Sequence, residues 1–504
     1  MKFNLRKMVV LVFMAVLSLS LTSCSVGSAS NNDMGYLVGS GAYAEGLESG
    51  ESYTEIVEND FINAKETPDS YFSIDANTAS YPNLRRMINN GAQIYPDAVR
   101  VEEMLNYFDY DYNTPTDNSV LAMTASVFDT PYNSETKLLT IGLAAKEVEF
   151  KQVKNNLVFL IDVSGSMYSG DKLPLVQQSF MMLAENLNPE DRVSIVTYAG
   201  EDSVALSGAY GYEKQKIMAV IEDLEAGGST AGSKGISTAY ELASKYFIEG
   251  GNNRVILATD GDFNVGLSKT KALEDYISEK RQTGIYFSVF GFGSGNIKSD
   301  KMEALALNGN GVYSYIDSVK EAKKALVQEI GGSMVTVAKD VKAGITFNSE
   351  YIESYRLIGY ENKLLTEEEF EDSNTDAGEL GSGHTVTVVY EIILTEKEFA
   401  EGENLAEVKV KYKPTENVGA DPANEETITL GVGTEAYTET PTADGAFVAS
   451  VVEFALILRN SEYKADSDLE SLISRLNAMD LTSDEFKAEF RDMVKEYYNQ
   501  KNKQ

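Results

Sequence analysis

The chain has few of the residues on which many enzymes and nucleic-acid-binding proteins depend. Its 504 residues include one cysteine, one histidine and no tryptophan, and 43 Lys and Arg stand against 78 Asp and Glu, giving a net charge of -35. No basic block occurs, which argues against nucleic acid as a partner and against adhesion of the folded part to an anionic lipid surface. With a single cysteine, no disulfide can form within the chain. The length leaves room for about three domains of ~150 residues each.

The first 24 residues have the pattern of an export signal. Lys2, Arg6 and Lys7 give a positive start, and the apolar run over positions 8–21 is short for a membrane span. Small residues precede Cys24, so the segment resembles the lipobox of bacterial lipoproteins. The resemblance implies lipidation of Cys24, and we expect acyl chains to hold the protein on the outer face of a bacterial membrane. The sequence leaves the choice of inner or outer membrane open, and an ordinary signal peptide with a stray cysteine is the alternative.

A buried strand in the middle of the chain ends in a group of oxygen-bearing side chains. Five apolar residues, 157–161, are followed by Asp162, Ser164 and Ser166 at alternate positions on a turn through Gly165. The carboxyl end of such a strand is where open α/β sheets place ligand sites. One carboxylate and two hydroxyls directed at one point suit a hard cation such as Mg²⁺. We take this turn as the candidate site.

Strand and helix patterns alternate through the middle of the chain. Runs rich in β-branched and aromatic residues predict strands, and apolar residues three and four apart predict helices between them. Strands are expected at residues 157–161, 193–198, 255–259, 285–290 and 312–316, with a short antiparallel edge strand at 203–207, and helices at 173–187, 213–224, 235–247, 270–282 and 319–330. This alternation predicts an α/β domain over residues 151–332 with a doubly wound, mainly parallel, Rossmann-like sheet.

Two later positions bring polar groups toward the same edge of the predicted sheet. Thr230 lies in a Gly-Gly-Ser-Thr loop before the helix at 235–247, and Asp260 directly follows the strand at 255–259. If the strand before Asp260 neighbours the strand before Asp162, their side chains and that of Thr230 converge. The adjacency of these two strands is the step that the sequence leaves open.

The spacing of these residues resembles the metal-ion-dependent adhesion site (MIDAS) of von Willebrand factor type A (VWA) domains. The matching residues are Asp162-x-Ser164-x-Ser166, Thr230 in its Gly-Gly-Ser-Thr loop, and Asp260 in Thr-Asp-Gly. The resemblance is closest to bacterial VWA lipoproteins grouped as similar to calcium-activated chloride channels, and it extends from about residue 71 to the C-terminus. The channel label finds no support, because no membrane-spanning run follows the signal segment.

The resemblance implies how such a site works. Ser164 and Ser166 would bind the metal directly, Asp162 and Asp260 would act largely through waters, and Thr230 would bind directly when a ligand is present. Mg²⁺ is the expected ion, with Mn²⁺ and Ca²⁺ as alternatives. Because Mg²⁺ takes six oxygens and keeps waters, one position stays open for an Asp or Glu side chain of a partner protein.

Other interpretations of these motifs are weaker. Residues 260–264 begin like a calcium-binding EF-hand loop but lack its later Gly and Glu, and residues 291–296 resemble a dinucleotide-binding loop with a displaced third Gly. Asp162, Ser164 and Ser166 could also form a hydrogen-bonded turn without metal.

Signals of an enzyme are missing from the sequence. His384, the sole histidine, lies in an alternating strand pattern typical of a structural residue, and lipidation of Cys24 would leave no thiol nucleophile. We therefore expect a protein that is not an enzyme. The favoured function is a membrane-anchored, metal-dependent protein-binding module, and the alternative is a metal-independent structural or assembly subunit of the cell envelope with a vestigial site.

The flanking regions differ from the α/β domain in pattern. We expect a signal segment at 1–24, a flexible tether at 25–70, a region of two short helices and a β-hairpin at 71–150, and strands followed by helices at 333–504. The hairpin strands near 120–128 and 137–145 are expected to join later strands, including 384–394, in one antiparallel β unit beside the α/β domain. Three C-terminal helices are expected at 446–459, 468–479 and 484–498, and residues 367–383 as an acidic loop.

Overall fold

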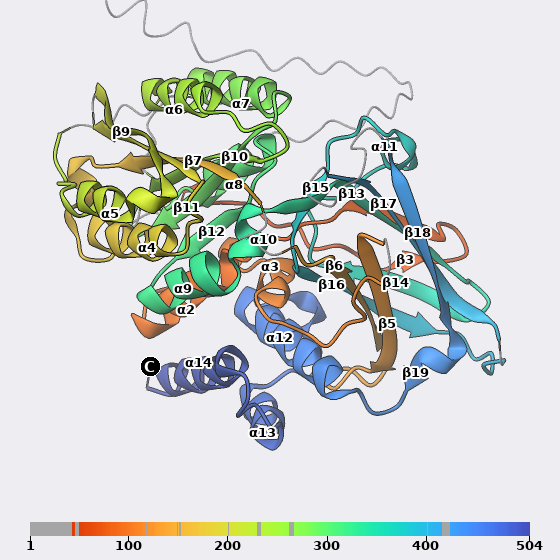
Figure 1. Cartoon of the computed structure of the whole chain (residues 1–504). Coiled ribbons are helices and arrows are strands. Elements are labelled where there is room, and N and C mark those ends of the chain that lie inside the picture. The colour runs from red at the N-terminus through yellow and green to blue at the C-terminus, as the bar shows by residue number, and fades with distance from the viewer. Residues whose placement is uncertain are drawn as a thin grey trace, which may run out of the picture. The chain divides into compact units, whose positions relative to one another are not determined.

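The computed structural model shows an α/β domain flanked by β-sheets and helices (Figure 1). It describes residues 43–45, 50–116, 119–148, 150, 153–199, 201–228, 233–261, 267–400, 402–415 and 424–503. Cys24 and Thr230 lie outside the described residues. Lipidation at Cys24 and the contribution of Thr230 to the site therefore stay predictions.

A six-stranded sheet forms the centre of the α/β domain, with the strand order β12-β11-β10-β7-β8-β9. All neighbouring pairs are parallel except β8 with β9, which runs antiparallel at one edge. Every residue of β7 and β10 is buried, as expected for central strands that helices cover on both faces. The strands are β7 Asn155–Asp162, β8 Arg192–Ala199, β9 Glu201–Tyr210, β10 Asn252–Thr259, β11 Ile285–Phe292 and β12 Tyr313–Ile316.

Alternate side chains of β7 enter two separate cores. Leu157, Phe159 and Ile161 pack with helices α4 and α5 on one face of the sheet. Val158 and Leu160 pack with α6, α7 and α8 on the other face. Figure 1 shows α4 and α6 on opposite sides of the sheet. The helices are α4 Leu173–Glu185, α5 Lys214–Glu222, α6 Ser233–Lys245, α7 Leu267–Arg281 and α8 Ser299–Asn308.

The doubly wound, mainly parallel α/β fold is confirmed, with three differences in detail. The edge strand β9 is 10 residues long, longer than the short strand expected at 203–207. Helix α8 was not predicted. The single closing helix expected at 319–330 is broken into α9 Val319–Lys323, a π-helical turn Lys324–Gln328 and α10 Ile330–Met334. A π-helical turn has a wider backbone hydrogen-bond pattern than an α-helix, so one apolar periodicity does not continue through it.

Two further sheets lie beside the α/β domain and share one core. The first has the order β15-β13-β17-β18, with β4 also paired to β13, and the second has the order β19-β5-β6-β16-β14-β3. The first comprises β4 Asp69–Ser73, β13 Thr336–Phe347, β15 Gly378–Gly381, β17 Asn404–Pro414 and β18 Glu426–Gly433. The second comprises β3 Ile62–Asn63, β5 Leu121–Asp129, β6 Lys137–Ala145, β14 Ile352–Ile358, β16 Thr385–Leu394 and β19 Tyr437–Thr438.

The predicted pairing of the N-terminal hairpin with a C-terminal strand is confirmed, because β6 pairs antiparallel with β16 and places Ile141 opposite Val388. The expectation of one antiparallel unit is wrong in one respect. The strands form two sheets whose facing sides pack together in one core, and the other face of the second sheet packs against helices through Leu138 and Val389.

Segments expected to lack regular structure contribute short elements. Part of the expected tether, residues 50–70, carries β2 Ser52–Thr54, β3 and the start of β4, which pair with β1 Tyr43–Glu45, β14 and β13. The expected loop at 367–383 contains α11 Glu367–Glu371 as well as β15. Elements of two to five residues are too short to show a periodic pattern, which explains both corrections.

Helices from the two ends of the described chain share a fourth core. They are α2 Ser80–Asn89, α3 Val101–Asn106, α12 Ala443–Arg459, α13 Leu469–Ala478 and α14 Glu485–Lys501, with a 3₁₀ turn Pro96–Ala98 before α3. Asp468 and Asp484 cap α13 and α14 by accepting backbone N–H groups of the first turn. Among the described helices, none is long and apolar enough to cross a bilayer.

Candidate functional site

The turn after β7 brings three predicted site residues together. Asp162 ends the strand, and its Oδ1 accepts the backbone N–H of Ser164 at 2.9 Å. The hydroxyl oxygens of Ser164 and Ser166 lie 2.9 Å apart. Gly165 donates its backbone N–H to the carbonyl of Gly228 at 3.2 Å, so the end of the 224–228 segment lies beside this turn. Two hydroxyls and one carboxylate therefore occupy one corner of the sheet edge.

Asp260 reaches the same edge because β10 is the neighbour of β7. The two strands pair in parallel with Ala258 opposite Ile161, so Asp260 and Asp162 both follow at their carboxyl ends. The Thr259 hydroxyl donates to Asp162 Oδ2 at 3.2 Å and links the two strand ends directly. The strand adjacency that the sequence left open is thus present.

Both site carboxylates are almost completely buried, with 0% of Asp162 and 1% of Asp260 exposed. Burial raises the pKa of Asp162 to about 6; hydrogen bonds from Ser164 oppose this rise, and the neighbouring Asp260 adds to it. The Tyr198 hydroxyl also donates to Asp162 Oδ2, at 3.2 Å. The Asp162 carboxylate is thus held in place by neutral donors.

Lys172 contacts Asp260 and is not among the predicted site residues. Its ammonium lies 2.7 Å from Asp260 Oδ2, and the two side chains are 9% and 0% exposed. The contact joins residues 88 positions apart, so local spacing does not reveal it. The available signal was a lysine at the start of a helix, where a hydroxyl or acid is preferred.

The loop at residues 293–298 forms a wall behind Asp260 and is held by the N-terminal strand β2. Gly261, at φ +92°, passes so close to this loop that a Cβ would come within 2.6 Å of the Asn296 carbonyl oxygen. On the other side of the loop, Ser52 donates its backbone N–H to Ile297 at 2.8 Å, and Glu51 Oε1 accepts the N–H of Gly295 at 2.9 Å. The N-terminal segment therefore buttresses the site.

The donors at this site fit a hard divalent cation. Such ions take carboxylate and hydroxyl oxygens, and the two serine hydroxyls already lie close enough to share one ion. The turn also reaches the surface, since Ser166 is partly exposed and Tyr168 is 83% exposed. The residues that would hold the ion are Asp162, Ser164, Ser166 and Asp260, with Thr230 outside the described residues.

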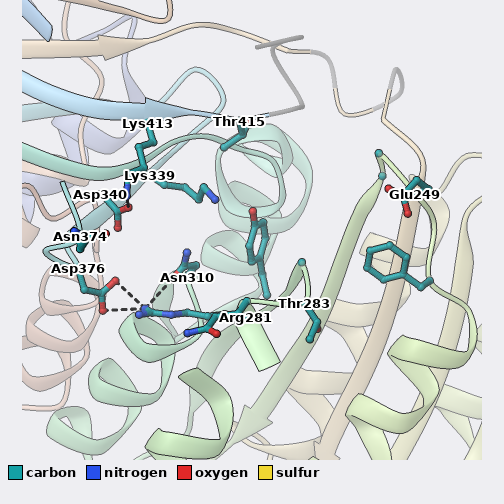
Figure 2. A pocket seen from close by; sticks show the side chains of 16 residues that line it. Glu249, Arg281, Thr283, Asn310, Lys339, Asp340, Asn374, Asp376, Lys413 and Thr415 are labelled. Atoms are coloured by element: carbon teal, nitrogen blue, oxygen red, sulfur yellow. Dashed lines mark hydrogen bonds and ion pairs between the residues drawn. The ribbon is translucent and has the colours of Figure 1, made fainter. Parts of the chain in front are cut away.

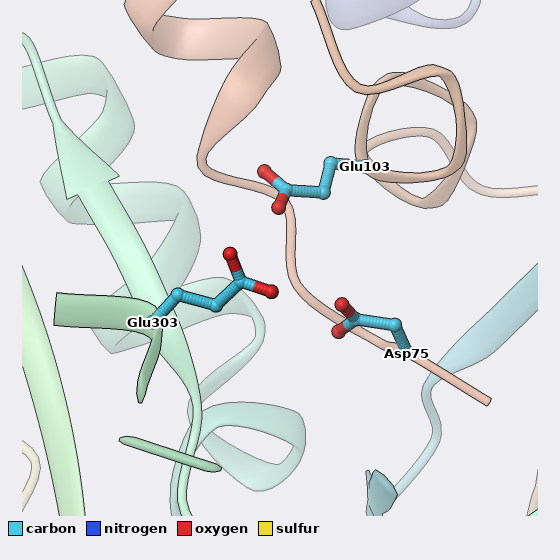
Figure 3. A group of neighbouring side chains, drawn as sticks. All are labelled: Asp75, Glu103 and Glu303. Atoms are coloured by element: carbon cyan, nitrogen blue, oxygen red, sulfur yellow. The ribbon is translucent and has the colours of Figure 1, made fainter. Parts of the chain in front are cut away.

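A second acidic cluster lies elsewhere, and two cations compensate most of its charge. Asp75, Glu103 and Glu303 are buried, with carboxylate oxygens within 4.8 Å of one another (Figure 3). The Lys363 ammonium lies 3.2 Å from Asp75 and 2.9 Å from Glu303, and Arg100 Nε lies 3.8 Å from Glu303. Because two cations occupy the cluster, we interpret it as an ion network that joins α8 to the N-terminal helices.

A polar cleft opens at the opposite, amino-terminal edge of the central sheet. It encloses about 660 Å³ between residues that precede β10 and β11 and residues of β13 and β17 (Figure 2). Arg281 forms an ion pair with Asp376 at 2.8 Å, and Lys413 forms one with Asp340 at 2.8 Å. The cleft therefore offers mostly paired charges.

His384, predicted to be structural, lines a different cavity of about 660 Å³ near Glu329. A Cβ on Gly332 would come within 2.3 Å of its ring, so the ring packs directly on the Gly332 backbone. Burial lowers the pKa of His384 to about 4, which keeps the ring neutral near pH 7.

Family models cover most of the chain. The von Willebrand factor type A domain matches residues 156–329, a model described as von Willebrand factor matches 47–140, and one described as the C-terminal region of the uncharacterized protein YfbK matches 332–499. The first range coincides with the α/β domain, and the other two contain the strands and helices around it.

Individual proteins are also similar to this chain. The uncharacterized protein YfbK of Escherichia coli strain K12 is 38% identical over 434 residues, which are 82% of this chain and 74% of YfbK. Human inter-alpha-trypsin inhibitor heavy chain H3 is 26% identical over 196 residues, 36% of this chain and only 22% of that protein. Among solved structures, a von Willebrand factor type A protein from Catenulispora acidiphila covers 69% of this chain and 80% of its own, with 15% identity and a TM-score of 0.41. Because of its identity with YfbK and its match to the type A domain model, the chain belongs to the von Willebrand factor type A domain proteins that are homologous to bacterial YfbK.

Proposed function

We propose that this chain is a binding protein that uses a MIDAS-type site to bind an acidic side chain of a partner protein. The observation that carries the proposal is the convergence of Asp162, Ser164, Ser166 and Asp260 at the carboxyl edge of the sheet, beside a turn that reaches solvent. A bound Mg²⁺, or Mn²⁺ or Ca²⁺ in its place, supplies an electrophilic centre with an open position for a carboxylate.

The protein side of this chemistry is preorganised. Tyr198 and Thr259 hold one oxygen of Asp162, and the backbone of Ser164 holds the other. These contacts fix the carboxylate without neutralising it, so its charge is available to a cation. The serine hydroxyls are neutral ligands, which leaves part of the cation's charge for the partner's acid group.

We further propose that the protein acts at the cell envelope, attached through a lipid on Cys24 to the outer face of a bacterial membrane. The support is the lipobox-like segment before Cys24 and the charge of -35, which keeps the rest of the chain away from anionic lipid. Partner binding at a tethered site of this kind serves adhesion or scaffolding, and we assign no catalytic role.

Substitution of Asp162 by asparagine tests the proposal. Asparagine is nearly isosteric, and its amide oxygen can still accept hydrogen bonds from Thr259 and Tyr198, so the change removes the negative charge together with the acceptor for the Ser164 N–H. We expect Mg²⁺ affinity, measured by calorimetry, to fall by at least about tenfold, which is about 1.4 kcal/mol. Partners captured by the wild type should be lost in the variant and in the presence of chelator.

Asp171→Asn is the matched control, because Asp171 is an exposed carboxylate nearby that lies outside the proposed ligand set. It should bind Mg²⁺ and partners like the wild type. Identical partner sets for wild type, Asp162→Asn and chelated protein would defeat the proposal and favour the alternative function.

That alternative is a metal-independent structural or assembly subunit of the cell envelope, and one observation favours it. Lys172 already neutralises Asp260 within the protein, so the site has an internal cation. A vestigial site could persist in this form as a buried ion pair. The role of Lys172 therefore decides how the site is understood.

A further inference from the structure

Lys172 occupies a position that does not suit it as a helix residue. It is the N-cap of α4, where Ser, Thr, Asp or Asn would accept backbone N–H groups, and its own side chain makes no such bond. The helix dipole also disfavours a cation at this end. The ion pair between the Lys172 ammonium and Asp260 therefore explains why a lysine stands at this position.

The path of the Lys172 side chain is fixed by its surroundings. It runs over Gly293, where a Cβ would lie 2.4 Å from Lys172 Cγ. Gly293 has φ +75°, a conformation that favours glycine, so both the backbone and the close approach depend on this residue. The ammonium is thereby directed to Asp260 with little freedom to move elsewhere.

The charges at the site leave a defined surplus. Among the residues that the structure describes at this site, Asp162 and Asp260 are buried carboxylates and Lys172 is the buried cation, so these three charges sum to minus one. Within the described ranges, no lysine or arginine pairs with Asp162. A divalent ion would convert this charge to one positive charge, whereas without Lys172 the loaded site would be neutral.

We propose that Lys172 is a specificity-determining residue that keeps the metal-loaded site positively charged, which weakens metal binding and strengthens binding of a partner's carboxylate. The inference rests on the proposed function of the same site. In this proposal Lys172 contributes to the function of the metal-loaded site. In a vestigial site, by contrast, the ion pair between Lys172 and Asp260 would take the place of the metal. The physical basis is Coulomb interaction at low exposure, where screening by solvent is weak.

Calorimetric titration of Mg²⁺ into the full-length protein tests whether Lys172 weakens metal binding. Lys172→Gln removes the charge and retains a donor for Asp260, and we expect it to bind Mg²⁺ at least about tenfold more tightly than the wild type. Lys172→Met, which removes the donor as well, should show the same gain. Because Asp260 then lacks its internal counter-ion, Mg²⁺ should raise the melting temperature of both variants more than that of the wild type.

A carboxylate probe tests whether Lys172 strengthens binding of a partner's carboxylate. With Mg²⁺ saturating, acetyl-glutamate amide should bind the wild type at least about tenfold more tightly than Lys172→Gln, because the loaded variant has lost its net positive charge. Lys172→Arg keeps the charge and should restore both affinities toward those of the wild type. Lys216→Met removes a lysine from an exposed ion pair in the same domain and controls for net charge.

The outcomes separate this inference from the proposed function. Wild-type protein that binds Mg²⁺ with the same affinity as Lys172→Gln would overturn the inference and leave the function standing. Equal probe affinity in the two loaded proteins would also overturn it. Absence of Mg²⁺ binding by every protein would overturn both.

Discussion

Replacing Arg85 with alanine should lower the free energy of unfolding by about 3–5 kcal/mol. Arg85 lies in α2 and is buried, and its guanidinium lies 2.6 Å from Asp317, 2.8 Å from Glu321 and 2.5 Å from Glu489. Asp317 and Glu321 belong to the end of the VWA region, and Glu489 belongs to α14. One side chain therefore compensates carboxylates from two distant parts of the sequence. Its removal leaves Asp317 and Glu321 buried without their ion-pair partner, whereas Glu489 keeps its ion pair with Lys320.

Urea unfolding followed by circular dichroism measures this effect. Arg491→Ala is the control, because Arg491 pairs with the exposed Asp492 on the same helix and should contribute only about 0–1 kcal/mol. A loss below about 1 kcal/mol for Arg85→Ala would contradict the assignment of Arg85 as the ion that joins these helices.

Replacing Glu102 with glutamine should remove a pH-dependent destabilisation of about 3 kcal/mol. Glu102 is 0% exposed, and neither of its carboxylate oxygens has a hydrogen-bond partner among the described residues. Burial raises the pKa of Glu102 to about 7, and the neighbouring Glu361 adds to the rise. The cations Arg100 and Arg459 oppose it.

The direction in which stability changes with pH follows from the number of protons bound by the folded and unfolded states. Because the pKa in the folded state lies above the ordinary value of 4.5, the folded state binds more protons than the unfolded state between pH 4.5 and about 7. The contribution of Glu102 to stability is therefore present at low pH and is lost as the pH rises through this window, by about 1.4 kcal/mol for each unit of pKa shift.

The measurement is the difference in unfolding free energy between Glu102→Gln and wild type at pH 4.5 and at pH 8. From pH 4.5 to pH 8, the unfolding free energy of the variant should rise relative to that of the wild type by about 3 kcal/mol. Glu398→Gln changes an exposed carboxylate and should give a difference that stays constant. The idea fails if the Glu102→Gln difference is also independent of pH.

The sequence allowed most of the α/β domain to be predicted, because its strands are buried on both faces and read as continuous apolar runs. β7 is the plainest example, with every residue buried. Apart from the ten-residue helix α8, the elements that pattern reasoning missed are short or lie at the surface. β18 is mostly exposed along its first six residues and carries only a faint alternation, and β3 has two residues. Such strands exist because a neighbouring strand pairs with them, which local sequence does not encode.

The candidate site divides in the same way. Asp162, Ser164 and Ser166 could be found because they lie within five positions, and Asp260 because it directly follows a predicted strand. Lys172 could not be assigned to the site, since its contact with Asp260 depends on the neighbouring loop and on the bare backbone of Gly293. A contact between residues far apart in the sequence can be identified only when the fold is known.

The contacts of Glu51 and Ser52 with the loop at residues 293–298 also determine how a pulling force would reach the site. Glu51 and Ser52 hold residues 293–298, and that loop touches Gly261 next to Asp260 and carries Gly293 beneath Lys172. Traction applied along the chain at residue 50 would load these few hydrogen bonds before it reached the sheets and helices beyond. Tension on the N-terminal segment would thus act first on the loop that contacts the candidate site.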